Sequence, residues 1–151
     1  MGKNNCDLCT LLAAPVPVPD GVLIWGDDQL SVVAVNEPEY PGFTRVVWNA
    51  HVKEMTDLAP QERTRVMDAV WAVEAAQRAV MAPEKINLAS FGNMTPHVHW
   101  HVIPRYLDDA HFPNPTWAPA VRASAPEVLA ARRAQLPALH AAIVKNLKAS
   151  S

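Results

Sequence analysis

Hydrophobic and polar positions along this chain follow two different periods, and the shorter one indicates strands. Apolar and polar residues that alternate with a period of two predict a strand, because successive side chains of a strand point to opposite faces of the sheet. Short runs of β-branched and aromatic residues also favour strands. Five segments have this character: residues 21–26, 29–35, 43–49, 85–91 and 97–103. The first two are separated by a short acidic connection, Asp27-Asp28, which suits a tight hairpin.

Apolar residues at spacings of three and four predict a long helix over residues 60–81. Val66, Val70 and Val73 share one face of it, and Pro60 lies in its first turn, where proline is tolerated. A second apolar stripe predicts a C-terminal helix, which Pro137 should break or kink.

The start of that C-terminal helix is expected at Ser124-Ala-Pro-Glu127, which matches a capping box. Residues 13–20 are too rich in proline for a helix or an inner strand, and an extended linker is expected there. Strands and helices segregated in this way predict an α+β fold. We expect a five- or six-stranded antiparallel sheet, with the long helix packed across it and 97–103 as an inner strand.

Length and charge narrow the class of protein. The chain has 151 residues, half of them apolar, which is enough for one domain with its own core. The formal net charge is −2, so no basic excess favours nucleic acid or a membrane surface as the partner. No apolar run reaches the roughly 20 residues of a membrane span, and no secretion signal is evident. A soluble cytoplasmic protein acting on small molecules is expected.

Three of the six histidines lie in HVHWHVIPR, residues 97–105, at every second position. On a strand, His97, His99 and His101 would point to the same side, about 6–7 Å apart along it. A neutral imidazole can attack phosphorus while its neighbours contact phosphate oxygens. Alternatively, two or three of the rings could hold a catalytic zinc ion with an open coordination site. Spacing alone does not separate these two chemistries.

The segment His97-Val-His99-Trp-His101-Val-Ile103 resembles the motif of the histidine triad family of nucleotide hydrolases and transferases. The likeness extends to NEPEYPG, to FTRVVWNAH and to INLASFGN, so that it covers about residues 6–105. The resemblance implies a histidine triad domain over residues 1–110. Residues 111–151 are then a C-terminal extension with a helix, within the same single domain.

The resemblance also implies roles for individual residues. His99 is the expected nucleophile at the α-phosphate, forming a nucleotidyl-histidine intermediate, and His101 contacts the phosphate. The implied substrate-binding residues are Asn36, Asn87, Asn93 and Thr95. Departures from the family pattern at Phe43, Asn93 and Met94 bear on the leaving group more than on the nucleophile.

Cys6 and Cys9 form a Cys-x-x-Cys pair, which in a reducing compartment indicates metal or redox chemistry rather than a disulfide. By itself the pair is half of a tetrahedral site. Some members of the family that the chain resembles hold zinc with such a pair and two histidines, which here implies Cys6, Cys9, His51 and His97. The alternative is two free thiols. A structural zinc ion and no organic cofactor are expected.

The expected activity is hydrolysis at the α-phosphate of a dinucleoside polyphosphate or a nucleoside phosphoramidate. Three alternatives stay open: transfer to phosphate or another acceptor, a zinc-dependent metallohydrolase, and a nucleotide-binding regulatory module. The resemblance implies a homodimer formed through the long helix, where Met67 and Trp71 extend the apolar surface.

Overall fold

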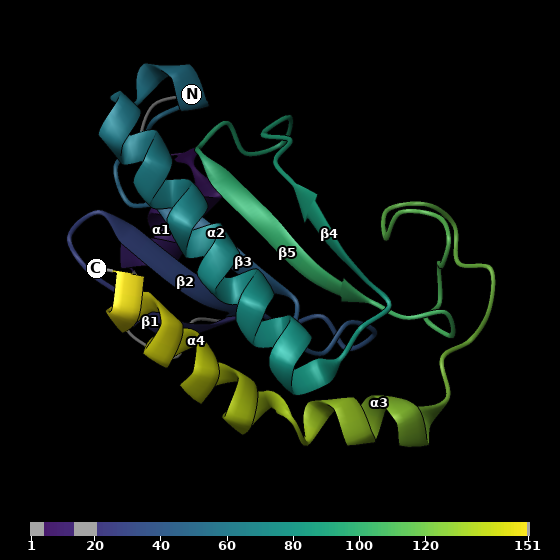
Figure 1. Ribbon diagram of the computed structural model, residues 1–151. Helices are drawn as coiled ribbons and strands as arrows, with labels where there is room; N and C mark the ends of the chain where they lie inside the picture. Colours follow the sequence, from purple (N-terminus) through teal and green to yellow (C-terminus); the bar gives the residue numbers. More distant parts are fainter. Residues whose placement is uncertain (1–4, 14–20, 151) are drawn as a thin grey trace.

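The computed structural model describes residues 5–13 and 21–150, which are built around one antiparallel sheet (Figure 1). Its strands lie in the order β1-β2-β3-β5-β4, so that β5 is an inner strand and β1 and β4 are the edges. The strands are β1 (Gly21–Gly26), β2 (Leu30–Val35), β3 (Thr44–Trp48), β4 (Lys85–Ala89) and β5 (His99–Arg105). The predicted α+β fold is thus confirmed.

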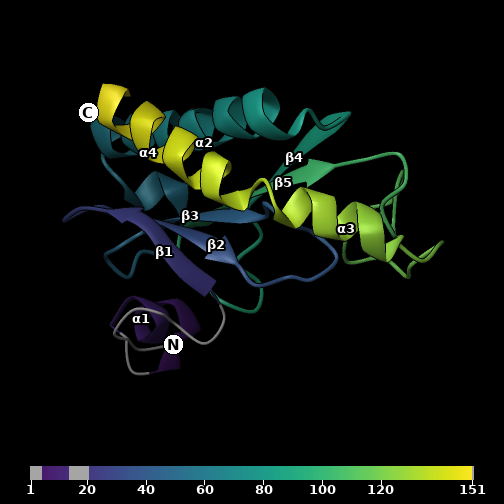
Figure 2. The same ribbon diagram turned by 90° about the horizontal axis from the view of Figure 1, so that it is seen from below.

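Helices cover the two faces of this sheet unequally. The helices α2 (Pro60–Met81) and α4 (Leu136–Ser150) lie side by side on one face. The short helix α1 (Asp7–Ala13) lies on the opposite face, as Figure 2 shows. The remaining helices are α3 (Pro126–Arg133), which precedes α4, and the short 3-10 helix η2 (Met55–Asp57) before α2. Among the described residues, no helix combines the length and hydropathy needed to cross a bilayer.

The main core lies between the sheet and the α2–α4 layer. Val66, Val70 and Val73 of α2 are fully buried there, as are Val46 of β3 and Val102 of β5. Because side chains alternate along a strand, burying Val102 in this core directs its neighbours in β5 to the other face. The period-two pattern therefore places the histidines on the face that α2 does not cover.

Gln77 of α2 ties this layer to the strands. Its side chain is fully buried, and its Nε2 donates hydrogen bonds to the carbonyl oxygens of Gly42 and Val102, each at 2.9 Å. Gly42 has a φ of 91°, and a Cβ atom there would lie 2.5 Å from the Met81 sulfur. Glycine is thus required where the loop between β2 and β3 passes the end of α2.

Three sequence-based expectations need correction or fall outside the described chain. β5 begins at His99 rather than at residue 97, because β3 ends at Trp48 and no longer continues the ladder. The Ser124 capping box is wrong, since α3 starts at Pro126 and the Ser124 Oγ is buried without a hydrogen-bond partner. The linker expected at 13–20 lies outside the described residues, apart from Ala13, which ends α1.

Candidate active site

His99 and His101 lie side by side on β5, with ring centroids 5.0 Å apart. His99 is only 7% exposed, and its Nδ1 lies 2.6 Å from the carbonyl oxygen of His97. A carbonyl oxygen can only accept, so Nδ1 carries the proton and donates this hydrogen bond. In the neutral ring the other nitrogen, Nε2, is therefore unprotonated and has the lone pair that a nucleophile needs.

The surroundings of both rings favour their neutral forms. Burial lowers the pKa of His99, and the positive charge of Arg45 lowers it further, against the hydrogen bond to His97 that raises it. Burial also lowers the pKa of His101 to about 4, with Arg45 and His99 as further causes. Because a proton would place a charge in a partly desolvated pocket beside another cation, His101 is neutral at pH 7.

One ring nitrogen of His101 has no hydrogen-bond partner among the described residues. This atom, Nε2, is buried. The ring of Phe43 contacts His101 edge-on, with centroids 5.3 Å apart. Since buried polar atoms are nearly always paired, the unpaired nitrogen is consistent with a site that a polar ligand completes.

Four further side chains form a cluster that could hold a metal ion: Cys6, Cys9, His51 and His97. Their ligand atoms all lie within 4.8 Å of one another. The His97 Nδ1 is 3.5 Å from both cysteine sulfurs, and the His51 Nδ1 is 3.4 Å from Cys9 Sγ. The structure thus brings together all four residues that the resemblance implied as metal ligands.

The orientation of His97 suits a ligand role. Its Nε2 donates to the carbonyl oxygen of Trp48 at 2.5 Å, which leaves Nδ1 facing the cysteines as the unprotonated nitrogen. This ring therefore belongs to a different group of side chains from His99 and His101. The expectation that all three histidines share one strand face holds for His99 and His101 alone, because His97 precedes β5.

The four predicted substrate-binding residues occupy different positions around the histidines. Asn36 is exposed directly after β2, and Asn93 is exposed in the loop before β5. Thr95 is half-buried in the same loop, where its carbonyl oxygen accepts from the His97 amide. The Asn87 side chain points toward Arg105, whose Nη1 donates to Asn87 Oδ1 at 2.7 Å. Asn36 comes from a different loop from Asn93 and Thr95.

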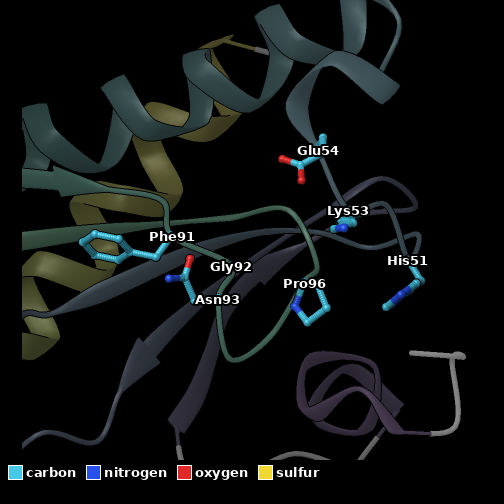
Figure 3. Close-up of a pocket in the computed structure, with 7 residues that line it drawn as sticks. All are labelled: His51, Lys53, Glu54, Phe91, Gly92, Asn93 and Pro96. Carbon is cyan, nitrogen blue, oxygen red and sulfur yellow. The ribbon is translucent and has the colours of Figure 1, made fainter.

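A pocket of about 530 Å³ lies between the loop before β5 and the segment that follows β3 (Figure 3). Its lining includes Asn93 and Pro96 on one side and His51, Lys53 and Glu54 on the other. The pocket therefore connects the region of the metal-ligand cluster with the loop that was predicted to contact phosphate.

Two features of this face were not singled out from the sequence. Arg45 is paired in register with His101 across β3 and β5, and it is the one charged residue of the apolar run 43–49. That isolated charge was the available signal. The second feature is a buried network in which Arg105 and Asp109 hold Tyr40 and His111. It joins Tyr40 to the segment 105–111, so no local pattern in the sequence indicated it.

Comparisons with known proteins agree with this geometry. The model of the HIT domain family matches residues 17–108. The chain is 31% identical over 97 residues to the asymmetrical bis(5'-nucleosyl)-tetraphosphatase of Schizosaccharomyces pombe, which covers 60% of this chain and 53% of that protein. The chain thus spans about half the length of this relative.

Solved structures of similar proteins share the fold. A histidine triad protein from Sinorhizobium meliloti is 26% identical, with a TM-score of 0.66 over 84% of this chain and 90% of that one. A zinc-bound histidine triad family protein from Mycobacterium smegmatis is 20% identical, with a TM-score of 0.63 over 99% of this chain and 100% of that one.

Proposed function

The chain belongs to the HIT domain family, and from this premise we propose that it is a nucleotide hydrolase that cleaves at the α-phosphate of its substrate. The proposed substrates are dinucleoside polyphosphates, such as a dinucleoside tetraphosphate, or nucleoside phosphoramidates. The name of the Schizosaccharomyces pombe relative supports the first of these classes. The observation that carries the proposal is the hydrogen bond from His99 Nδ1 to the carbonyl oxygen of His97.

The proposed reaction proceeds in two displacements at phosphorus. The lone pair of His99 Nε2 forms a bond to the α-phosphorus while the bond to the bridging oxygen breaks. With a dinucleoside tetraphosphate, the leaving group is a nucleoside triphosphate. Water then attacks the same phosphorus, the P–N bond breaks, and a nucleoside monophosphate and a proton are released. The Nδ1 proton stays on the ring throughout, held by the His97 carbonyl.

Other residues of the open face are proposed to bind the substrate. His101 contacts the α-phosphate through its buried Nε2. Asn36 binds the ribose, while Asn93 and Thr95 supply polar contacts to the phosphate or the leaving group. Asn87 is proposed to act from the β4 side, where Arg105 fixes its amide. These assignments follow the family resemblance.

We further propose that Cys6, Cys9, His51 and His97 hold a structural zinc ion. Tetrahedral zinc with bonds of about 2.3 Å to sulfur and about 2.0–2.1 Å to nitrogen separates S and N ligands by about 3.5 Å. The observed S···N separations of 3.4–3.5 Å fit this donor set. The zinc-bound relative from Mycobacterium smegmatis supports the choice of metal. The ion would tie α1 to the sheet beside His99.

Two proposals concern the whole protein. A homodimer would form through α2 and the edge strand β4, where Trp71 is 48% exposed. We also propose a cytoplasmic location, because a Cys-x-x-Cys pair suits a reducing compartment.

A substrate panel tests the proposed activity. Dinucleoside tri- and tetraphosphates and adenosine phosphoramidate are incubated with the protein, with and without a chelator, and nucleoside monophosphate is measured. We expect turnover that His99→Ala abolishes and that brief chelation leaves intact. Loss of activity on chelation alone, in protein that remains folded, would favour the metallohydrolase. Nucleoside diphosphate formed in added phosphate would indicate a phosphorylase.

A further inference from the structure

Arg45 occupies a central position on the face that carries the two catalytic histidines. In the β3–β5 ladder it lies directly opposite His101, and in the β2–β3 ladder it lies opposite Val33. Directly opposed residues of an antiparallel pair point to the same face, with Cβ atoms about 4.5–5.5 Å apart. The side chain of Arg45 therefore starts beside the His101 ring.

The neighbours of Arg45 on its own strand do not explain a charged residue there. Phe43 and Val47 are two positions away on the same face, and Val47 is fully buried. Arg45 itself is only half-buried. A guanidinium group at this position can donate to an anion that binds over the histidines.

The charge of Arg45 reaches both histidines of the site. It contributes to lowering the pKa of His99 and of His101. Arg45 thus brings a positive charge to the part of the face where the two rings lie.

A phosphate bound over the two rings carries negative charge, and Arg45 starts directly opposite His101 on the same face of the sheet. An arginine keeps its charge across the pH range of enzyme assays, and its planar guanidinium can donate parallel hydrogen bonds to two phosphate oxygens. Lys53, which lines the pocket on the segment that follows β3, is the other cation that could bind this phosphate.

We propose that Arg45 is a substrate-binding residue, whose guanidinium donates hydrogen bonds to the non-bridging oxygens of the phosphate that His99 attacks. This inference rests on the proposed function, since it assumes that a nucleotide phosphate lies over His99. It assigns Arg45 to the attacked phosphate rather than to the base or to the phosphates of the leaving group.

Ligand binding without turnover tests this assignment. Four nucleoside monophosphates and their four nucleosides are titrated into wild-type protein, Arg45→Met and Arg45→Lys by calorimetry. We expect Arg45→Met to weaken binding of the preferred monophosphate about 10- to 100-fold. Binding of the matching nucleoside should change less than about 3-fold, because it has no phosphate. Arg45→Lys keeps the charge but loses the paired donors of the guanidinium, so its affinity for the monophosphate should lie between those of wild type and Arg45→Met.

Arg78→Met is the matched control, because Arg78 is exposed on α2, on the opposite side of the sheet, and should bind both ligands as wild type does. Circular dichroism verifies that each variant is folded. Equal weakening of nucleoside and monophosphate in both Arg45 variants would overturn the assignment in favour of a base contact. Unchanged monophosphate binding, with loss in Lys53→Met instead, would also overturn it.

Turnover separates the inference from the proposed function. Arg45→Met should lower kcat/KM by a similar factor for a dinucleoside tetraphosphate and for adenosine phosphoramidate, because both present one attacked phosphate. A loss confined to the tetraphosphate would place Arg45 on the leaving group and contradict the inference, while the hydrolase proposal would stand. Wild-type protein that binds a monophosphate through Arg45 but hydrolyses neither substrate would contradict the proposed activity alone.

Discussion

At the scale of single residues, the three histidines of one motif are held by three different environments. His97 donates to the Trp48 carbonyl and faces the cysteines, whereas His99 donates to the His97 carbonyl. His101 has a buried nitrogen with no partner among the described residues. The backbone thus assigns the protonated nitrogen of His97 and of His99. The roles proposed for the three rings differ accordingly: a metal ligand, a nucleophile and, for His101, a phosphate contact.

The role proposed for His101 leads to a prediction about rate and pH. His101→Ala should raise the activation free energy by about 2–4 kcal/mol, which lowers kcat/KM about 30- to 1000-fold. Since burial holds the pKa of His101 at about 4, the neutral ring is the working form, and its protonation should affect the rate only below about pH 5. Steady-state kinetics from pH 4.5 to 8 measures both. An ionisation near pH 6.5 that disappears in His101→Ala would contradict this account.

Residues of this site differ in how far the sequence could identify them. The period-two spacing of His99 and His101 was sufficient to predict a shared face. Arg45 was not singled out, because its significance depends on which strand β3 pairs with, and pairing is not visible in local periodicity. Strand order is set by contacts between distant segments.

At the scale of elements, periodicity predicted all five strands and the long helix, and the errors lie at their ends. The alternating pattern continues through His97 and Val98, but the Val98 amide donates to Val52 and its carbonyl accepts from Trp48, outside the regular ladder. At the other boundary, Pro126 fixes the first turn of α3, so that Ala125 is the N-cap and Ser124 lies one residue too early.

The proposed zinc ion would strengthen the attachment of the short helix α1. The apolar cluster at this helix is small: Cys6, Leu8 and Val47 are buried, and Cys9, Leu11 and Leu12 pack against them. Cys6→Ser should therefore remove about one zinc ion per chain and lower the free energy of unfolding, because metal binding contributes directly to folding. Metal analysis and urea unfolding measure the two effects.

Asp7→Asn provides the control for that experiment, because Asp7 is exposed in the same helix and is outside the cluster. It should retain the metal content of the wild type. Undiminished zinc in Cys6→Ser would reject the ligand assignment.

The loop between β5 and α3 is fixed by the buried pair of Arg105 and Asp109. The Arg105 Nε lies 2.7 Å from Asp109 Oδ2, and both side chains are about 2% exposed. The Asp109 carboxylate also accepts from the backbone amides of Tyr106, His111 and Phe112. Against the opposing effect of burial, these donors lower the pKa of Asp109 to about 2.

Asp109→Asn should therefore lower the free energy of unfolding by about 3–5 kcal/mol at pH 7, because it leaves the Arg105 charge buried without its partner. The folded-state pKa lies below the unfolded value, so the contribution of this carboxylate is complete above about pH 4 and declines toward pH 2. Urea unfolding between pH 7 and 3 measures the difference. A difference from wild type that stays constant, or grows, as the pH falls below 4 would contradict this explanation.

At the scale of the whole molecule, the two faces of the sheet have different tasks. The α2–α4 layer lies on one face, as Figure 2 shows, and the main core is between them. The other face carries α1, the metal-ligand cluster, His99 and His101. The division of the chain into a domain at 1–110 and an extension at 111–151 stays a prediction. The extension contributes α4 to the core layer, which favours its place within one domain.

The proposed homodimer would cover the exposed side of α2. Light scattering at micromolar concentration should give about twice the chain mass of 16.5 kDa, and Trp71→Glu should shift the protein toward the monomer by placing a charge in the interface. Glu127→Lys, at an exposed position of α3, controls for a general effect of changed charge. A mass of 16.5 kDa for the wild type would contradict the proposal.

The central claim is that His99 forms a covalent bond to the substrate's phosphorus, and the most direct measurement is to trap that intermediate. Wild-type protein is mixed with a dinucleoside tetraphosphate, quenched rapidly without acid, and digested for mass spectrometry. The account predicts a nucleoside monophosphate group on the peptide that contains His99, attached to His99 itself, and neither adduct nor turnover in His99→Ala. A nucleotidyl group on another residue, or turnover that survives in His99→Ala, would contradict it.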